Sequence, residues 1–472
     1  MKPITLGVIV GNRGFFPDYL VADARKELTK YFEKINVKPI WVSPEETKLG
    51  GIETWDDAQK CAKLFKSHKD EIDGILVTLP NFGDEKAVAN TLRYAELNVP
   101  VLIHAIPDES SKMTLQHRRD SFCGKISVCN NLVQYGIPFT LTTFHCVSIN
   151  DPTFEEDFSN FLQTCRVVRG MKNLRVGAVG ARTGAFNTVR YSEKILESTG
   201  ISVETIDLSE IFGRIGKLKD DDVVVKTKVK EIKEYIATPN IPDFALVRMA
   251  KLGVVLDKWI TENSLKAISL QCWTSIQEYY GIAPCTVMSM YSNSLIPNAC
   301  EVDVLGSISM YILQLASGVP SALVDWNNNY KNDPDKAVLF HCSNFPKSIF
   351  KEAKMDFQEI ISGAVGKENT YGTVVGEIKA SPMTFLRAST DDEIGSIRAY
   401  IGEGETTKDP LDTFGGYGVL HVPQLQELLQ FMCENGFEHH TAVNPTHVAQ
   451  GIAEALDKYL GWDLYFHTGL ED

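Results

Sequence analysis

The chain has 472 residues, a hydrophobic fraction of 44% and a formal net charge of −14. This length allows two or three domains with separate cores, and the composition is ordinary for a globular protein. The negative charge argues against nucleic acid and anionic membranes as partners. The ten cysteines include no CxxC pair, which favours reduced, mostly buried thiols over a disulfide framework or a structural zinc site.

The N-terminal apolar run is short and breaks at Gly11. It has neither the longer apolar core nor the cleavage site of a signal peptide. No stretch approaches the roughly 20 apolar residues that a membrane span needs. We therefore expect a cytoplasmic protein without a membrane partner.

The first part of the chain, residues 1–172, alternates between strand and helix patterns. Its apolar runs of strand length are separated by segments with helical periodicity, and these runs are 4–10, 38–43, 74–79 and 99–105. The alternation predicts a doubly wound parallel sheet. Arg13 lies in the loop after the first run, where we expect either a helix-entry turn or a ligand-binding loop at the carboxyl edge of the sheet.

The strand and helix pattern restarts at residue 173 and continues to about 346, which predicts a second, central α/β domain. Its first turn has Gly177, Gly180 and Gly184, which is not the GxGxxG spacing of a dinucleotide site. Residues 347–472 are richer in glycine and β-branched residues and end in helices. The predicted fold is therefore two successive doubly wound, Rossmann-like or flavodoxin-like α/β domains followed by a β-rich, barrel-like C-terminal domain with terminal helices.

Three polar residues between 300 and 346 stand out as candidate metal ligands. Glu301 falls on the apolar stripe of a predicted helix over 301–317, where a carboxylate needs a partner. Asp303 is interpreted as a first-turn acid that complements the helix dipole. Asp325 and His341 each follow an apolar run of strand length, at the strand end where α/β sheets bind ligands.

A histidine pair near the C-terminus adds a further candidate. His439 and His440 are adjacent in the sequence, so their side chains are expected to point in different directions. We take His440 as the fourth ligand. His447 is a weaker candidate that is also explained as the start of the next helix.

The segments ACEVDVLGSISM, ALVDW, FHCSNFP and HHTAV resemble the C-terminal half of the L-fucose isomerase and L-arabinose isomerase superfamily. The resemblance implies that Glu301, Asp325 and His440 hold a divalent metal. His341 resembles the extra histidine ligand of the arabinose branch. The resemblance also implies a homo-oligomer, trimeric or hexameric, with active sites between subunits.

An aldose–ketose isomerase moves a proton between two neighbouring carbons of an open-chain sugar through an enediol. We expect Glu301 and Asp325 to transfer this proton as well as to bind the metal. Mixed carboxylate and imidazole ligands suit Mn²⁺, with Mg²⁺ or Co²⁺ as alternatives. The sugar is expected to be a deoxy sugar, a pentose or a sulfosugar such as fucose, arabinose or sulfoquinovose. The candidates for contact with it are Arg13, Trp326, Arg387 and His439.

Two other functions stay open at this stage. Successive α/β domains also occur in sugar-binding proteins without catalysis, although the pair of acids and the lack of a signal peptide argue against one. An NAD-dependent oxidoreductase would use the turn from Gly177 to Gly184, whose glycine spacing argues against it.

Overall fold

The computed structural model describes residues 2–184 and 186–470. The chain forms two compact units. Unit 1 consists of residues 1–169 and 450–461, and unit 2 of residues 170–449 and 462–472. Throughout the described residues, the helices lack the combination of length and apolar character that a membrane crossing requires.

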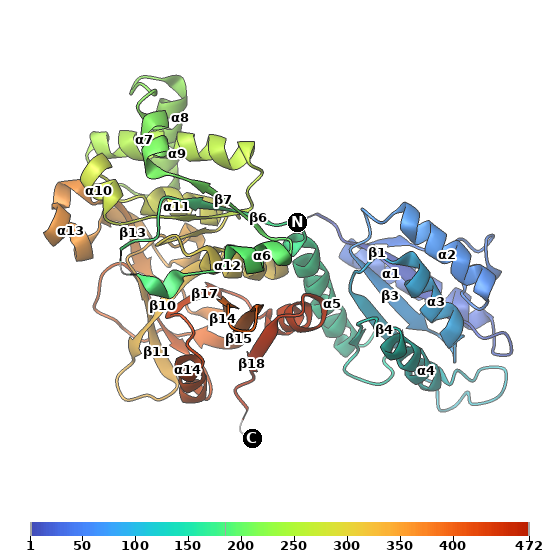
Figure 1. Cartoon of the computed structure of the whole chain (residues 1–472). Coiled ribbons are helices and arrows are strands. Elements are labelled where there is room, and N and C mark those ends of the chain that lie inside the picture. Colours follow the sequence, from blue (N-terminus) through green and yellow to red (C-terminus); the bar gives the residue numbers. More distant parts are fainter. Residues whose placement is uncertain (1, 185, 471–472) are drawn as a thin grey trace. The chain divides into compact units, whose positions relative to one another are not determined.

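Unit 1 is a five-stranded parallel sheet between two layers of helices (Figure 1). The strand order is β2-β1-β3-β4-β5, with β1 at Thr5–Val10, β2 at Lys38–Ile40, β3 at Gly74–Leu79, β4 at Val101–Ala105 and β5 at Thr140–Leu141. The helices are α1 (Tyr19–Ile35), α2 (Trp55–Ser67), α3 (Glu85–Ala95), α4 (Ser121–Gln134) and α5 (Pro152–Met171).

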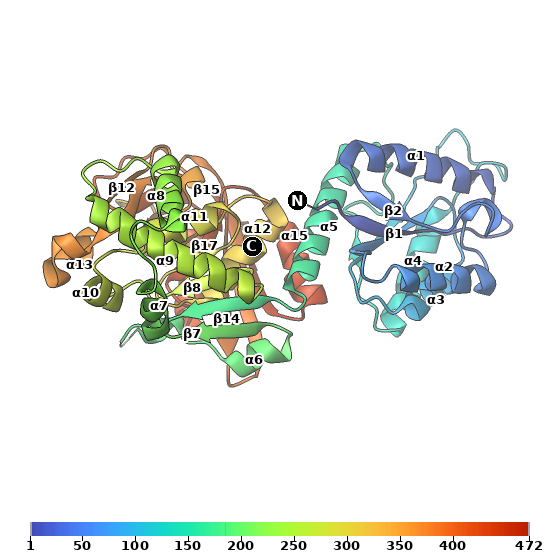
Figure 2. The ribbon, with the colours of Figure 1, turned by 90° about the horizontal axis from the view of Figure 1, so that it is seen from above.

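The two faces of this sheet are covered by different helices. In Figure 2, α1 and α5 lie on one side of the strands, and α2, α3 and α4 lie on the other. The central strands β1 and β3 are buried along their whole length. Their continuous apolar runs therefore fill two cores at once, as expected for a parallel sheet.

Unit 2 combines a small parallel sheet with a large mixed sheet. The small sheet has the order β7-β6-β8-β9, with β6 at Arg175–Val179, β7 at Ser202–Ile206, β8 at Ala267–Leu270 and β9 at Asn298–Ala299. Its helices are α6 (Glu193–Ser198), α7 (Leu208–Ile215), α8 (Val223–Tyr235), α9 (Asp243–Glu262), α10 (Ser275–Tyr280) and α11 (Cys285–Asn293).

The large sheet has nine strands in the order β12-β13-β16-β11-β10-β17-β14-β15-β18, and a further pairing of β15 with β16 closes part of it on itself. The strands are β10 (Ala322–Asn329), β11 (Lys336–His341), β12 (Lys354–Phe357), β13 (Tyr371–Glu377), β14 (Ser381–Asp391), β15 (Ser396–Thr406), β16 (Gly416–His421), β17 (His440–Asn444) and β18 (Asp463–His467). The remaining α-helices are α12 (Val304–Ser317), α13 (Glu359–Val365), α14 (Leu425–Glu434) and α15 (Ala449–Glu454).

Helix α12 joins the two sheets of unit 2. It contacts β8 of the small sheet and β14 and β17 of the large sheet, and it is almost entirely buried. An apolar sequence without a polar face suits this sandwiched position. The residues just before α12 are therefore held between both sheets.

The predicted fold class is confirmed: α/β architecture is followed by a large, partly closed β-rich sheet with terminal helices. The division into units differs from the predicted ranges 173–346 and 347–472. Strands β10 and β11 pair with β17 and β16 in the middle of the large sheet, so both ranges contribute to one unit. The start of unit 2 at residue 170 lies close to the boundary expected at 173.

Candidate metal centre

Glu301 lies in a short turn before α12, whereas the sequence predicted that the helix would begin at this residue. The helix begins at Val304, and Asp303 is its N-cap, because its Oδ1 accepts a hydrogen bond from the Gly306 N–H at 2.9 Å. Glu301 and Val302 have left-handed backbone conformations, with φ of 55° and 59°. This conformation is rare for a β-branched residue such as valine, so neighbouring contacts must hold the turn.

Four predicted ligands meet around one point in unit 2. Glu301 Oε2 lies 3.7 Å from His341 Nε2 and 3.9 Å from His440 Nε2. Asp325 Oδ1 lies 3.5 Å from His440 Nε2, because Asp325 pairs directly with His440 across β10 and β17. The sequence analysis placed Asp325 and His341 at the ends of α/β strands. Instead, Asp325 lies inside β10, and His341 ends β11, which is antiparallel to β10.

The two carboxylates each keep an oxygen without a partner. Glu301 Oε2 and Asp325 Oδ1 are buried and have no hydrogen-bond partner among the residues described. Leaving a charged oxygen unpaired in a protein interior is costly, so both atoms are suited to bind a cation. The potential ligand atoms of Glu301, His341 and His440 lie within 4.8 Å of one another, and so do those of Asp325, His439 and His440.

His440 is oriented to present a lone pair to this point. Its Nδ1 donates a hydrogen bond to Asp303 Oδ2 at 2.9 Å. Burial raises the pKa of Asp303, but the charge of Arg387 and the hydrogen bond from His440 more than offset this, and the pKa falls well below its usual value. Because an ionised carboxylate only accepts hydrogen bonds, Nδ1 carries the proton and Nε2 is free to bind a metal.

His341 has the opposite arrangement. The backbone N–H of Cys342 donates to His341 Nδ1 at 3.0 Å, so the proton of a neutral ring lies on Nε2, which faces Glu301. Burial raises the pKa of Glu301, but its interactions with the imidazoles of His341 and His440, 3.7 and 3.9 Å away, lower the pKa below its usual value. The other Glu301 oxygen, Oε1, accepts from Trp273 Nε1 at 2.8 Å. Glu301 is thus held as a carboxylate from two sides.

Arg387 is one of the residues predicted to contact a sugar, and it lies in the interior. Its guanidinium is 0% exposed and contacts Asp303 Oδ2 at 2.5 Å and Oδ1 at 3.1 Å. Its Nε donates to Glu438 Oε2 at 3.1 Å, and Glu438 also accepts from Ser389. Arg387 thus fixes the carboxylate that orients His440, and it is enclosed by these ion pairs.

Of the remaining candidates in unit 2, His439 faces the metal centre. Its Nε2 lies 3.7 Å from Asp325 Oδ1, and its side chain is 43% exposed. Trp326 packs its ring against Phe385 and donates its indole N–H to the Tyr400 hydroxyl at 3.0 Å.

The two remaining candidates, His447 and Arg13, have contacts of their own. His447 contacts the Gly404 carbonyl on β15 at 3.2 Å. Arg13 belongs to unit 1, where it forms an ion pair with Glu85 and donates to the Gly83 carbonyl.

The structure adds residues around the centre that the sequence analysis did not identify. Trp273 holds Glu301 from the loop after β8. The ring of Phe186 lies 5.6 to 5.8 Å from those of Trp273, His439 and His440. These contacts join loops that are far apart in the sequence, so no local motif indicates them.

Unit 2 also contains a cavity of about 590 Å³. Val302 and Glu438, which neighbour the ligand Glu301 and the His439–His440 pair in the chain, form part of its lining. Arg182, Arg190 and Arg398 also line it. The cavity lining therefore includes three guanidinium groups, and it reaches chain neighbours of the ligands and not the ligands themselves.

Comparison with known proteins gives two family matches. Residues 7–172 match the "Fucose/sulfoquinovose isomerase, N-terminal domain", and residues 339–467 match the "L-fucose isomerase, C-terminal domain". The sulfoquinovose isomerase of Priestia megaterium is 24% identical over 338 residues, which cover 71% of this chain and 72% of that protein. The sulfoquinovose isomerase of Alkalicoccus urumqiensis is 24% identical over 369 residues, covering 76% and 78%.

Proposed function

The chain belongs to the L-fucose isomerase-like family of sugar isomerases, and on this premise we propose that it is a metal-dependent aldose–ketose isomerase that acts through an enediol. The observation that carries the proposal is the pair of unpartnered carboxylate oxygens on Glu301 and Asp325, which face the lone pair of His440. Because this family consists of enzymes, membership argues against the alternative function of a sugar-binding protein without catalysis.

The residues of the centre fit a hard divalent cation. Glu301, Asp325 and His440 supply two carboxylate oxygens and one imidazole nitrogen, a ligand set that suits Mn²⁺, with Mg²⁺ or Co²⁺ as alternatives. The sequence analysis also expected His341 to be a ligand. Its tautomer instead supports a different role, in which the Nε2–H is directed at Glu301 Oε2 from 3.7 Å.

When bound, the metal would polarise the C1 and C2 oxygens of the open-chain sugar and stabilise the charge of the enediol. One carboxylate removes the C2 hydrogen as a proton, and the same proton, or one from the other carboxylate, is returned at C1, while the hydroxyl proton of O2 passes to O1. The low pKa of Glu301 keeps it ionised and ready to accept the proton. Trp273 holds its Oε1 in place through a hydrogen bond of 2.8 Å.

We further propose that the substrate is an aldose with an anionic group, of the sulfosugar kind. The relatives named above are sulfoquinovose isomerases, and Arg182, Arg190 and Arg398 line a cavity that reaches Val302 and Glu438, the chain neighbours of Glu301 and His439. Guanidinium groups bind oxyanions through paired N–H donors. We expect Arg398→Ala to raise the KM for a sulfosugar while the KM for a neutral aldose stays within about twofold. Equal changes for both sugars would contradict the anionic assignment.

The first experiment tests metal and isomerase activity together. Chain purified with EDTA would be given Mn²⁺ and screened against fucose, arabinose and sulfoquinovose by ketose formation. We expect turnover only with metal, and a loss of about 10²- to 10⁴-fold in Glu301→Gln, the range for a catalytic acid or base. Glu197→Gln, on the exposed face of α6, is the matched control. Turnover without metal, or an active Glu301→Gln chain, would refute the proposal.

The expected oligomer can be tested with the same variants. We propose that Arg13, on the ligand edge of the unit 1 sheet, serves the active site of a neighbouring copy. Mixing inactive Arg13→Ala and Glu301→Gln chains would then create some sites with both native residues and restore part of the activity. No recovery in mixed oligomers would contradict a shared site, and sizing chromatography gives the number of subunits.

A further inference from the structure

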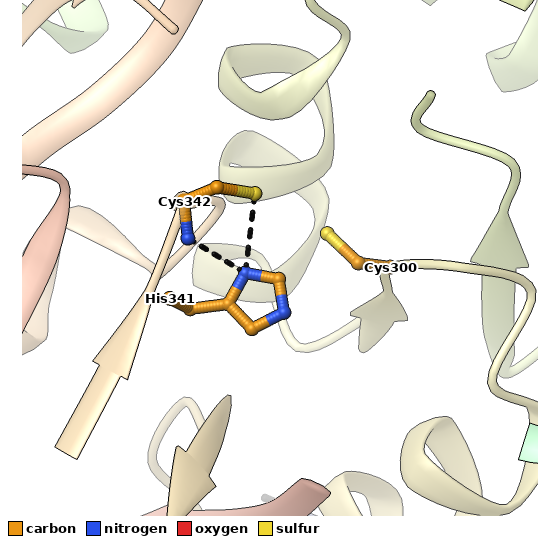
Figure 3. A group of neighbouring side chains, drawn as sticks. All are labelled: Cys300, His341 and Cys342. Carbon is orange, nitrogen blue, oxygen red and sulfur yellow. Dashed lines mark hydrogen bonds between the residues drawn. The ribbon is translucent and has the colours of Figure 1, made fainter. Parts of the chain in front are cut away.

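Cysteines far apart in the sequence meet behind the metal centre. Cys300, His341 and Cys342 have their potential ligand atoms within 4.8 Å of one another. Cys342 Sγ lies 3.3 Å from His341 Nδ1. Cys272 also lies close to Cys300, because the potential ligand atoms of Cys272, Cys300 and Glu301 lie within 4.8 Å of one another. Figure 3 shows the sulfur of Cys342 next to Nδ1 of the imidazole ring and the sulfur of Cys300 directed toward the same ring.

We propose that Cys300, Cys342 and the Nδ1 of His341 form a second metal site, for a thiophilic divalent ion such as Zn²⁺ or Cd²⁺. Thiolates and imidazole are the ligands that such ions prefer. Two ligands at about 2.1 and 2.3 Å from a tetrahedral zinc lie roughly 3.6 Å apart. The Nδ1 to Sγ distance of 3.3 Å is close to this value. Binding releases the two thiol protons to solvent.

The tautomer of His341 makes this site compatible with the carboxylate centre. Nδ1 carries a lone pair and no proton, because it accepts from the Cys342 backbone N–H, and an ion bound to Nδ1 would take the place of this hydrogen bond. The Nε2–H meanwhile faces Glu301. An ion on Nδ1 therefore leaves the Nε2–H directed at Glu301 Oε2, 3.7 Å away, and Glu301, Asp325 and His440 stay free for a hard cation.

The position of the site indicates a structural purpose. Cys300 directly precedes Glu301 and Val302, whose left-handed conformations are costly for residues with a Cβ. An ion on Cys300 would tie this turn to the end of β11. Asp303, on its other side, is already fixed by Arg387. The turn that carries Glu301 would then be anchored at both ends, which pre-organises the proposed catalytic carboxylate.

The experiment uses Co²⁺ and Cd²⁺ as spectroscopic probes on the full chain freed of metal. We expect a thiolate-to-metal charge-transfer band for one ion per chain, which disappears in Cys300→Ser and in Cys342→Ser. Cys123→Ser and Cys433→Ser are the controls, because both thiols are exposed and lie outside the group. An ion held only by Glu301, Asp325 and His440 has no sulfur ligand and gives no such band.

A second measurement needs no variant. Cys342 is partly exposed, so we expect Cd²⁺ to block its alkylation while Cys123 and Cys433 still react, as read by peptide mass spectrometry. A band that persists in both serine variants, or equal Cys342 labelling with and without Cd²⁺, would overturn the site.

The anchoring role of the thiolate site rests on the proposed function, but the two proposals have separate readouts. If the chain shows the charge-transfer band but no sugar turnover, the proposed isomerase function is wrong and the thiolate site stands. If it shows turnover without the band, the thiolate site is wrong and the isomerase function stands.

Discussion

Replacing Asp303 by asparagine tests whether this carboxylate orients the metal centre. Asp303 is fully buried and accepts hydrogen bonds from Gly306, Arg387 and His440. Asparagine keeps the shape and can still cap α12, because it is as good an N-cap residue as aspartate. What is lost is the negative charge, which pairs with Arg387 and fixes the proton on His440 Nδ1.

Two effects of different size follow from these contacts. Removing one partner of a buried ion pair costs about 3–5 kcal/mol. We expect a loss of stability at the lower end of this range, since Glu438 still pairs with Arg387. This is a large part of the roughly 5–15 kcal/mol that stabilises a typical domain. Losing the group that orients a ligand histidine lowers metal affinity by about 10- to 100-fold.

Both effects are measurable on one preparation. Urea unfolding gives the change in the free energy of unfolding, and electron paramagnetic resonance of free Mn²⁺ gives the affinity of the folded chain. Asp207→Asn is the matched control, because Asp207 caps the exposed helix α7 by accepting from Ser209 but makes no contact with the centre. A folded Asp303→Asn chain with unchanged Mn²⁺ affinity would refute the role assigned to Asp303.

Three further predictions concern neighbouring groups. Trp273→Phe removes the hydrogen bond to Glu301, worth about 1.5–3 kcal/mol for a charged acceptor, and should lower kcat by roughly tenfold or more, measured at saturating Mn²⁺. Phe186→Ala uncovers the histidine rings and should raise the KM for sugar without unfolding the chain. Because the pKa of Asp303 is depressed in the fold, unfolding releases a carboxylate that takes up a proton near pH 4. Stability should therefore fall below about pH 4, and Asp303→Asn should flatten this loss in urea titrations.

The sequence was informative about elements and about isolated polar residues. Apolar runs predicted strands β1 to β4 of the first parallel sheet and the helix over 301–317 that contains α12, because parallel strands and sandwiched helices are buried all round. Glu301, Asp325, His341 and His440 could be singled out because polar groups beside apolar runs need partners. The structure brings these four together, and their roles remain proposals.

The pairing of distant segments could not be predicted in the same way. Asp303 was interpreted as a helix-dipole acid because its partners, Arg387 and His440, lie 84 and 137 residues away. Arg387 carries no local sign that it would be buried. The cysteines lack CxxC spacing, so their meeting depends entirely on how β9 and the end of β11 are placed by the fold.

The four residues from Cys300 to Asp303 show why the centre depends on the whole of unit 2. Asp303 begins α12 and binds Arg387 on β14, while Glu301 reaches Trp273 after β8 and His341 on β11. The left-handed turn between them persists only if both anchors hold. A change that loosens either sheet therefore moves Glu301 before it unfolds the chain. Activity should consequently be lost at lower denaturant concentrations than the helical signal, which activity and circular dichroism measured side by side would reveal.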